Sequence, residues 1–189
     1  MSASTQIAVE RFGSGPVLLL LHGEEPPGPT WERQRQLAER WSLVIPRRRP
    51  AIPDPGPEAD AADVSGLLTR RTHLVGISSG ALIVTLAAEA DPERVRSLTL
   101  IEPPEELTEP AAQHVLDDLA RPGIPVMILS GGNDATVEKR ADTLARRLDA
   151  RREVLETEGD AVPRAAGFNE VLESFLRGAV VGTARFRTS

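Results

Sequence analysis

Cysteine is absent from this 189-residue chain, so the sequence excludes disulfides and thiolate metal sites and gives no sign of its redox compartment. Lysine is almost absent too, because Lys139 is its only instance and arginine carries the other positive charges. The only short basic run is Arg47-Arg48-Arg49. The formal net charge of −6, spread over interspersed acids and bases, argues against a nucleic-acid partner.

Long apolar runs are also missing, and no segment is long enough to span a membrane. The N-terminus lacks the basic start, apolar middle and small-residue cleavage site of a secretory leader. We therefore expect a soluble cytoplasmic protein that partners neither with membranes nor with nucleic acid and that carries no metal or cofactor. The length suits one domain with a real core, which we expect to span residues 1–189.

The sequence contains short apolar runs that alternate with segments of helical spacing. The expected strands are 5–11, 17–21, 43–45, 74–77, 95–101, 125–129 and 152–155. The expected helices are 30–41, 58–70, 81–88, 110–120, 136–148 and 169–176. This alternation predicts an α/β fold with a mainly parallel, doubly wound sheet. The core should cover about 6–176, with a frayed tail at 177–189.

The most informative stretch is a Gly-x-Ser-x-Gly turn formed by Gly76, Ser78 and Gly80. The expected strand 74–77 precedes it, and an apolar segment, 81–88, follows at once. This context predicts a sharp strand-to-helix turn with an exposed serine hydroxyl at its apex. The alternative is that Ser78 only caps the helix that follows.

Ligands of parallel α/β sheets bind outside the carboxyl ends of the strands. The topology alone therefore selects the loops at Gly23, Ser78, Glu102, Asp134 and Asp160. We expect the functional site to be built from these loops.

Four landmarks make the chain resemble the α/β-hydrolase superfamily from about residue 6 to residue 176. They are the apolar strand ending in His22-Gly23, the turn 76–80, the strand and loop 126–134, and the segment 158–176. The resemblance implies a small, capless member of that fold, with the cap reduced to the helix 110–120. It also implies that the backbone N–H groups of Glu24 and Ser79 form an oxyanion hole.

The same resemblance implies Ser78 as nucleophile and Asp134 as the acid of the catalytic triad. The family's catalytic histidine normally follows a glycine in the last loop, but here Asp160 follows Gly159. Aspartate is a weak base at neutral pH, so the predicted site is an atypical Ser-Asp-Asp set. Two alternatives stay open: Asp134 as a helix cap, and Asp160 as drift in a protein that no longer needs a base.

None of the three histidines is an obvious replacement for the base. His73 should lie roughly 16 Å from Ser78 at the far end of the same strand. His22 ends the neighbouring strand, where it either braces the oxyanion loop or acts as a base. His114 is either a solvated residue or part of a lid over Ser78. Together with Gly23 and the carboxylates of Glu25 and Glu102, His22 and His114 make up the expected pocket.

These observations leave two classes of function. The first is an enzyme that acts on an ester, thioester or lactone-like small molecule, either as a slow hydrolase or as a non-hydrolytic biosynthetic cyclase or lyase. The second is an inactive pseudo-hydrolase that binds a small molecule or a partner protein. Only roughly twenty residues separate Glu102 from Pro125, so the site should be open. Excluding water would then need a large substrate or a second subunit in a homo-oligomer.

Overall fold

The computed structural model describes residues 7–49, 56–120, 123–157 and 161–185. Its seven-stranded sheet has the order β1-β3-β2-β4-β5-β6-β7. The strands are β1 (Val9–Phe12), β2 (Val17–Leu21), β3 (Ser42–Pro46), β4 (Thr72–Ile77), β5 (Val95–Ile101), β6 (Val126–Ser130) and β7 (Arg151–Val154). Strand β1 is antiparallel to β3 and every other neighbouring pair is parallel. The predicted fold class is thereby confirmed.

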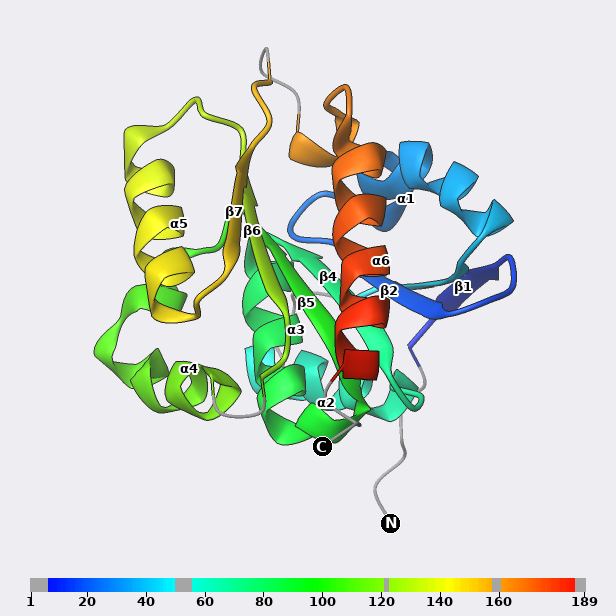
Figure 1. The fold of residues 1–189 in the computed structure, drawn as a ribbon, viewed down its shortest axis with the longest axis horizontal. Coiled ribbons are helices and arrows are strands. Elements are labelled where there is room, and N and C mark those ends of the chain that lie inside the picture. The colour runs from blue at the N-terminus through cyan, green and yellow to red at the C-terminus, as the bar shows by residue number, and fades with distance from the viewer. Residues whose placement is uncertain (1–6, 50–55, 121–122, 158–160, 186–189) are drawn as a thin grey trace.

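Helices cover both faces of this sheet (Figure 1). One face carries α1 (Pro27–Trp31), the 3-10 helix η1 (Glu32–Glu39) and α6 (Phe168–Arg185). The other carries α2 (Pro57–Leu67), α3 (Ser79–Ala90), α4 (Gln113–Ala120) and α5 (Ala135–Arg147). Each face has its own buried apolar cluster, and the central strand β4 is buried along its whole length because helices cover it on both sides.

The segment 30–41 differs from the single α-helix that the sequence predicted. It divides into α1 and η1, and its buried side chains Trp31, Gln34 and Leu37 recur every three residues. That spacing is the period of a 3-10 helix, whose winding stacks the three side chains directly above one another on the buried face.

The last helix is longer than predicted. We expected it to end at Leu176, but α6 continues to Arg185. Ala179 is only 4% exposed, so the helix still packs on the sheet one turn beyond the predicted end. Gly178 lies inside the helix, where one glycine is tolerated at a cost of about 1 kcal/mol relative to alanine.

The region between β5 and β6, where we predicted one short helix, is formed by η3 (Glu105–Thr108), η4 (Pro110–Ala112) and α4. Helix α4 packs against α3, with Val115, Leu116 and Leu119 buried in the core. These three lie at helical spacing within the predicted helix 110–120. The apolar side chains of α4 therefore hold this segment on the face of the sheet that carries α3.

Candidate active site

Ser78 occupies the apex of a strained turn between β4 and α3. Its backbone has φ 53° and ψ −127°, in the left-handed region that non-glycine residues rarely adopt. A Cβ atom at Gly76 would lie 2.4 Å from the carbonyl oxygen of Gly80, and one at Gly80 would lie 2.6 Å from that of His22. The two glycines are therefore required because the backbones meet there. This geometry confirms the predicted turn.

The loop after β2 lies directly against this turn. Strands β2 and β4 pair in parallel, with Leu21 opposite Gly76, so both chains leave the sheet at the same edge. A Cβ atom at Gly23 would lie 2.9 Å from the carbonyl oxygen of Ile77 and 3.0 Å from the Cβ of Ser78. Two of the predicted site loops are thus brought into van der Waals contact.

The side chain of Glu24 occupies the mouth of this turn. The Ser78 Oγ donates a hydrogen bond to the Glu24 Oε2 at 3.0 Å. Burial would raise the pKa of Glu24, but hydrogen bonds from Ser79, from its own backbone N–H and from Ser78, with the charge of Arg48, lower it below its ordinary value. The predicted oxyanion-hole residue thus also supplies a carboxylate that contacts the predicted nucleophile.

Arg48 is a site residue that sequence reasoning missed. Its Nη1 donates to the Ser79 Oγ at 2.7 Å and to the Gly23 carbonyl oxygen at 3.2 Å. Its Nε donates to the Asp60 Oδ2 at 2.8 Å, and Asp60 is buried on α2. The only sequence signal was the short basic run after β3, at the same sheet edge as Ser78. Arg48 ties α2, the loop after β2 and the start of α3 together.

His22 braces the loop after β2. The backbone N–H of Arg48 donates to its Nε2 at 3.1 Å, so Nε2 is an acceptor and Nδ1 must carry the proton. The Nδ1 in turn donates to the Gly23 carbonyl oxygen at 2.9 Å. Burial lowers the pKa of His22, and the hydrogen bond to Gly23 offsets only part of this. Both ring nitrogens are thus engaged in holding the loop, as one of the two sequence interpretations proposed.

The other two histidines lie on other parts of the domain. His73 is fully buried on β4, bonds the Ser97 Oγ through Nδ1 at 2.7 Å and packs edge-on against Trp41. Burial, with a smaller effect of Arg96, lowers its pKa to about 4. His114 is exposed on α4 and borders a hollow of about 390 Å³ beside the outer face of α3.

Asp134 and Glu102 follow adjacent strands, β6 and β5. The Asp134 Oδ1 accepts hydrogen bonds from the backbone N–H groups of Thr136 (2.7 Å) and Val137 (3.1 Å), so it caps α5. The bonds from Val137 and Thr136 lower the pKa of Asp134. Burial raises the pKa of Glu102, and the negative charges of Glu138 and Asp134 add to this effect. Glu102 therefore holds a proton more readily than Asp134 does.

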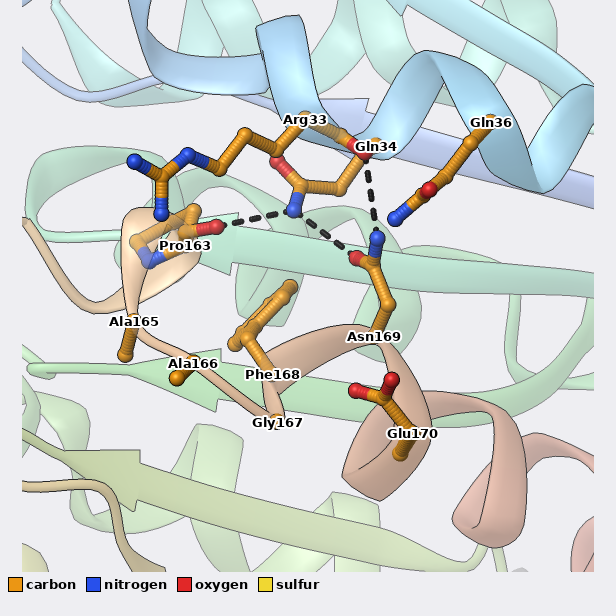
Figure 2. A pocket seen from close by; sticks show the side chains of 10 residues that line it. All are labelled: Arg33, Gln34, Gln36, Pro163, Ala165, Ala166, Gly167, Phe168, Asn169 and Glu170. Carbon is orange, nitrogen blue, oxygen red and sulfur yellow. Dashed lines mark hydrogen bonds between the residues drawn. The ribbon is translucent and has the colours of Figure 1, made fainter.

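Asp160 lies outside the described residues, so its role remains a prediction. The segment from residue 161 onward is joined to η1 by hydrogen bonds. The Gln34 Nε2 donates to the Pro163 carbonyl oxygen and to the Asn169 Oδ1, each at 2.8 Å, beside a hollow of about 330 Å³ (Figure 2). Arg164 pairs with Glu25 at 2.8 Å, so the predicted pocket residue Glu25 links this segment to the loop after β2.

Within the ranges that the structure describes, no group of three or more histidines, cysteines, aspartates or glutamates is arranged to hold a metal ion. Across the same ranges, none of the helices has the length and apolar character needed to cross a membrane.

Comparison with known proteins agrees with this geometry. The family described as alpha/beta hydrolase fold matches residues 67–151. A curated relative, the pimeloyl-[acyl-carrier protein] methyl ester esterase of Aeromonas salmonicida, is 29% identical over 156 residues, covering 75% of this chain and 56% of the relative. The Aeromonas hydrophila enzyme of the same name is 30% identical over the same shares. The chain thus spans about half the length of these curated relatives.

Among solved structures, one from a study of carboxylesterases of Nitrososphaera gargenis superposes with a TM-score of 0.79 at 14% identity, covering 96% of this chain and 99% of that one. At these identities the likeness concerns the fold alone. The sheet order, the Ser78 turn and the family match identify an α/β-hydrolase fold. The chain has the α/β-hydrolase fold, and over residues 67–151 it is similar to the family of that description.

Proposed function

We propose that the chain is a serine esterase that attacks a small carboxylic ester, thioester or lactone through the Ser78 hydroxyl. The observation that carries this proposal is the strained backbone of Ser78, with φ 53° and ψ −127°, at the carboxyl edge of the sheet. Such strain costs of order 1–3 kcal/mol and persists only where the surrounding structure enforces it. Here Gly76 and Gly80 allow the close backbone approach that holds the turn.

The proposed reaction also needs an oxyanion hole, for which the backbone N–H groups of Glu24 and Ser79 are the candidates. Glu24 follows Gly23 on the loop after β2, and Ser79 is the first residue of α3, where helical N–H groups have no acceptor within the helix. Backbone N–H groups there would stabilise the negative charge that develops on an ester carbonyl oxygen during attack. The positive end of α3 adds to this effect.

The curated relatives suggest the substrate class. Both are named for hydrolysis of a methyl ester on an acyl group carried by a protein. By analogy with these methyl esters, we propose an ester with a small alcohol portion. Asp134 and Asp160 remain the predicted acidic partners of Ser78 in this proposal.

A second candidate function is a pseudo-hydrolase that binds a small molecule or a partner protein without turnover. The observation that favours it is His22, whose two ring nitrogens are both engaged in holding the loop after β2. A serine hydroxyl is a poor nucleophile until a base removes its proton. The two functions differ in one result, whether a product forms that depends on Ser78.

A burst assay with p-nitrophenyl acetate tests the proposal. Wild type should release p-nitrophenol in proportion to enzyme, and Ser78→Ala should not. Ser65→Ala on α2 is the matched control, because it removes a serine hydroxyl away from the site, and it should behave as wild type. Saturable ligand binding with no burst in wild type would support the pseudo-hydrolase instead. A burst gained only in Asp160→His would show that the chain is a hydrolase scaffold without its base.

A further inference from the structure

The contact of Ser78 with an acid sets this site apart from one in which a histidine contacts the serine. The chain has only three histidines, and all three lie in the described residues. His22 is held by the loop after β2, His73 is buried on β4 beside Ser97, and His114 borders a hollow on the outer face of α3. The side chain that accepts the Ser78 proton in a hydrogen bond is Glu24.

We propose that Glu24 is the general base of this site, taking the proton from Ser78 directly and returning it to the leaving group. This inference rests on the proposed esterase function. It assigns the carboxylate the role that an imidazole would otherwise fill, and it assigns no role in proton transfer to His22.

A continuous series of polar contacts, from Asp60 through Arg48 and Ser79, orients the Glu24 carboxylate. Asp60 holds Arg48 at 2.8 Å, and Arg48 donates to the Ser79 Oγ at 2.7 Å. The Ser79 hydroxyl, whose lone pair is taken by Arg48, is hydrogen-bonded to Glu24 and lowers its pKa, as does the Ser78 hydroxyl at 3.0 Å. A catalytic base needs this orientation by further groups, because a freely rotating carboxylate spends little time in line with the nucleophile. Arg48 and Ser79 are accordingly positioning residues.

The reaction balances with the groups present. As the Ser78 Oγ bonds to the ester carbonyl carbon, its proton moves to Glu24 and the carbonyl electron pair moves to the oxygen. Collapse of this intermediate expels the alcohol oxygen, which takes the proton from Glu24, and leaves an acylated Ser78. A water molecule then attacks the acyl carbon and gives its proton to Glu24. The second collapse releases the acid and returns the proton to Ser78.

One feature of the resting site must change when substrate enters. The Glu24 carboxylate accepts a hydrogen bond from its own backbone N–H, the group expected to bind the oxyanion. An incoming carbonyl oxygen would take over that N–H, while the bond to Ser78 remains. If the carboxylate instead blocked the hole, its removal would accelerate acylation.

The charges around Glu24 determine the pH readout. Arg48 acts on it from the chain after β3, Glu25 at the next position is paired with Arg164, and burial lowers the pKa of His22, which accepts the Arg48 backbone N–H. Hydrogen bonds and Arg48 keep Glu24 ionised below the ordinary glutamate value of about 4.3. Acylation by wild type should therefore persist at pH 5, where a free imidazole of pKa about 6.5 is mostly protonated.

The test is the rate of the p-nitrophenyl acetate burst at pH 5 and pH 7 in wild type, Glu24→Gln and Glu24→Ala, with circular dichroism to confirm folding at each pH. Glu24→Gln should lower the rate about tenfold or more, which is less than the full effect of a base whose pKa lies near the working pH, because the pKa of Glu24 is lowered. Added formate should partly restore the rate of Glu24→Ala, since it supplies a carboxylate that a structural role would not need. Glu32→Gln on η1 removes an exposed charge elsewhere and should match wild type.

An unchanged or faster burst in Glu24→Gln, or no response of Glu24→Ala to formate, would overturn the assignment of the base. A wild-type burst that disappears between pH 7 and pH 5 in a folded protein would overturn it as well. The proposed esterase function would survive all three results as long as Ser78→Ala abolishes the burst. If Ser78→Ala keeps the burst, the esterase proposal itself fails.

Discussion

The guanidinium of Arg48 lies between the buried carboxylate of Asp60, at 2.8 Å, and the hydroxyl of Ser79, at 2.7 Å. The other carboxylate oxygen of Asp60, Oδ1, is buried without a hydrogen-bond partner within the described residues. Arg48 is therefore what allows a charged aspartate to be buried on α2. The arginine links the stability of the domain to the geometry of the site.

Removal of this arginine should strongly destabilise the protein. Arg48→Met would leave Asp60 buried and unpaired, which costs about 3–5 kcal/mol in the free energy of unfolding. The double variant Arg48→Met, Asp60→Asn should recover a large part of that loss because no charge remains buried. Urea unfolding of wild type, both single variants and the double variant measures the coupling. Additive effects of the two substitutions would contradict this account.

The glycines of the turn give a second prediction. Gly76→Ala would place a methyl group 2.4 Å from the Gly80 carbonyl oxygen, so the backbone must shift. We expect a loss of about 1–3 kcal/mol in the free energy of unfolding, together with loss of the acylation burst. Gly66→Ala on α2 is the matched control, since an added Cβ meets nothing within 4 Å. It should gain about 0.5–1 kcal/mol and keep the burst. Equal behaviour of the two variants would show that the turn is not tightly held.

Stability should fall in mild acid because of His73. The folded state keeps its imidazole neutral down to a pKa of about 4, whereas the unfolded chain binds a proton below about 6.5. The contribution of neutral His73 to the free energy of unfolding amounts to about 3 kcal/mol. It is fully present above pH 6.5 and is lost as pH falls to about 4. His73→Gln removes this titration. The difference in unfolding free energy between wild type and variant should shrink over that pH range, and parallel curves would disprove the assignment.

Asp134 provides a test that separates a helix cap from a catalytic acid. Its Oδ1 accepts two backbone N–H groups of α5. If Glu24 acts directly as the base, Asp134→Asn should keep both the cap and the burst, since asparagine caps as well as aspartate. Asp134→Ala should cost about 1 kcal/mol of stability. A burst reduced tenfold or more in Asp134→Asn at unchanged stability would instead support the acid role that the sequence predicted.

The sheet and the Ser78 turn could be predicted because their determinants are local. Apolar runs fix the strands, and close backbone contact demands glycine at Gly76 and Gly80. The resemblance placed Glu24 and Ser78 on adjoining loops. The hydrogen bond between their side chains could not be predicted, because it depends on the rotamer of Glu24 and on the contacts that hold it.

Arg48 was missed for a related reason. It lies on the loop that follows β3, and it meets Ser79 and Asp60 only because β3, β2 and β4 are neighbours in the sheet. Pairings so distant in sequence leave no local pattern. The predicted length of α6 was too short because glycine is typical of a helix end, and Gly178 follows the predicted end closely. In the structure Ala179 is buried against the core, and this packing stabilises the helix beyond Gly178.

The central claim, that Ser78 is a working nucleophile, is tested most directly by covalent labelling with a fluorophosphonate, followed by trypsin digestion and mass spectrometry. Cleavage after Arg71 and Arg94 releases the peptide 72–94, which contains both Ser78 and Ser79. The account predicts one label on Ser78, absent from Ser78→Ala and weakened in Glu24→Gln. No label on folded wild type, or a label on Ser79, would contradict it.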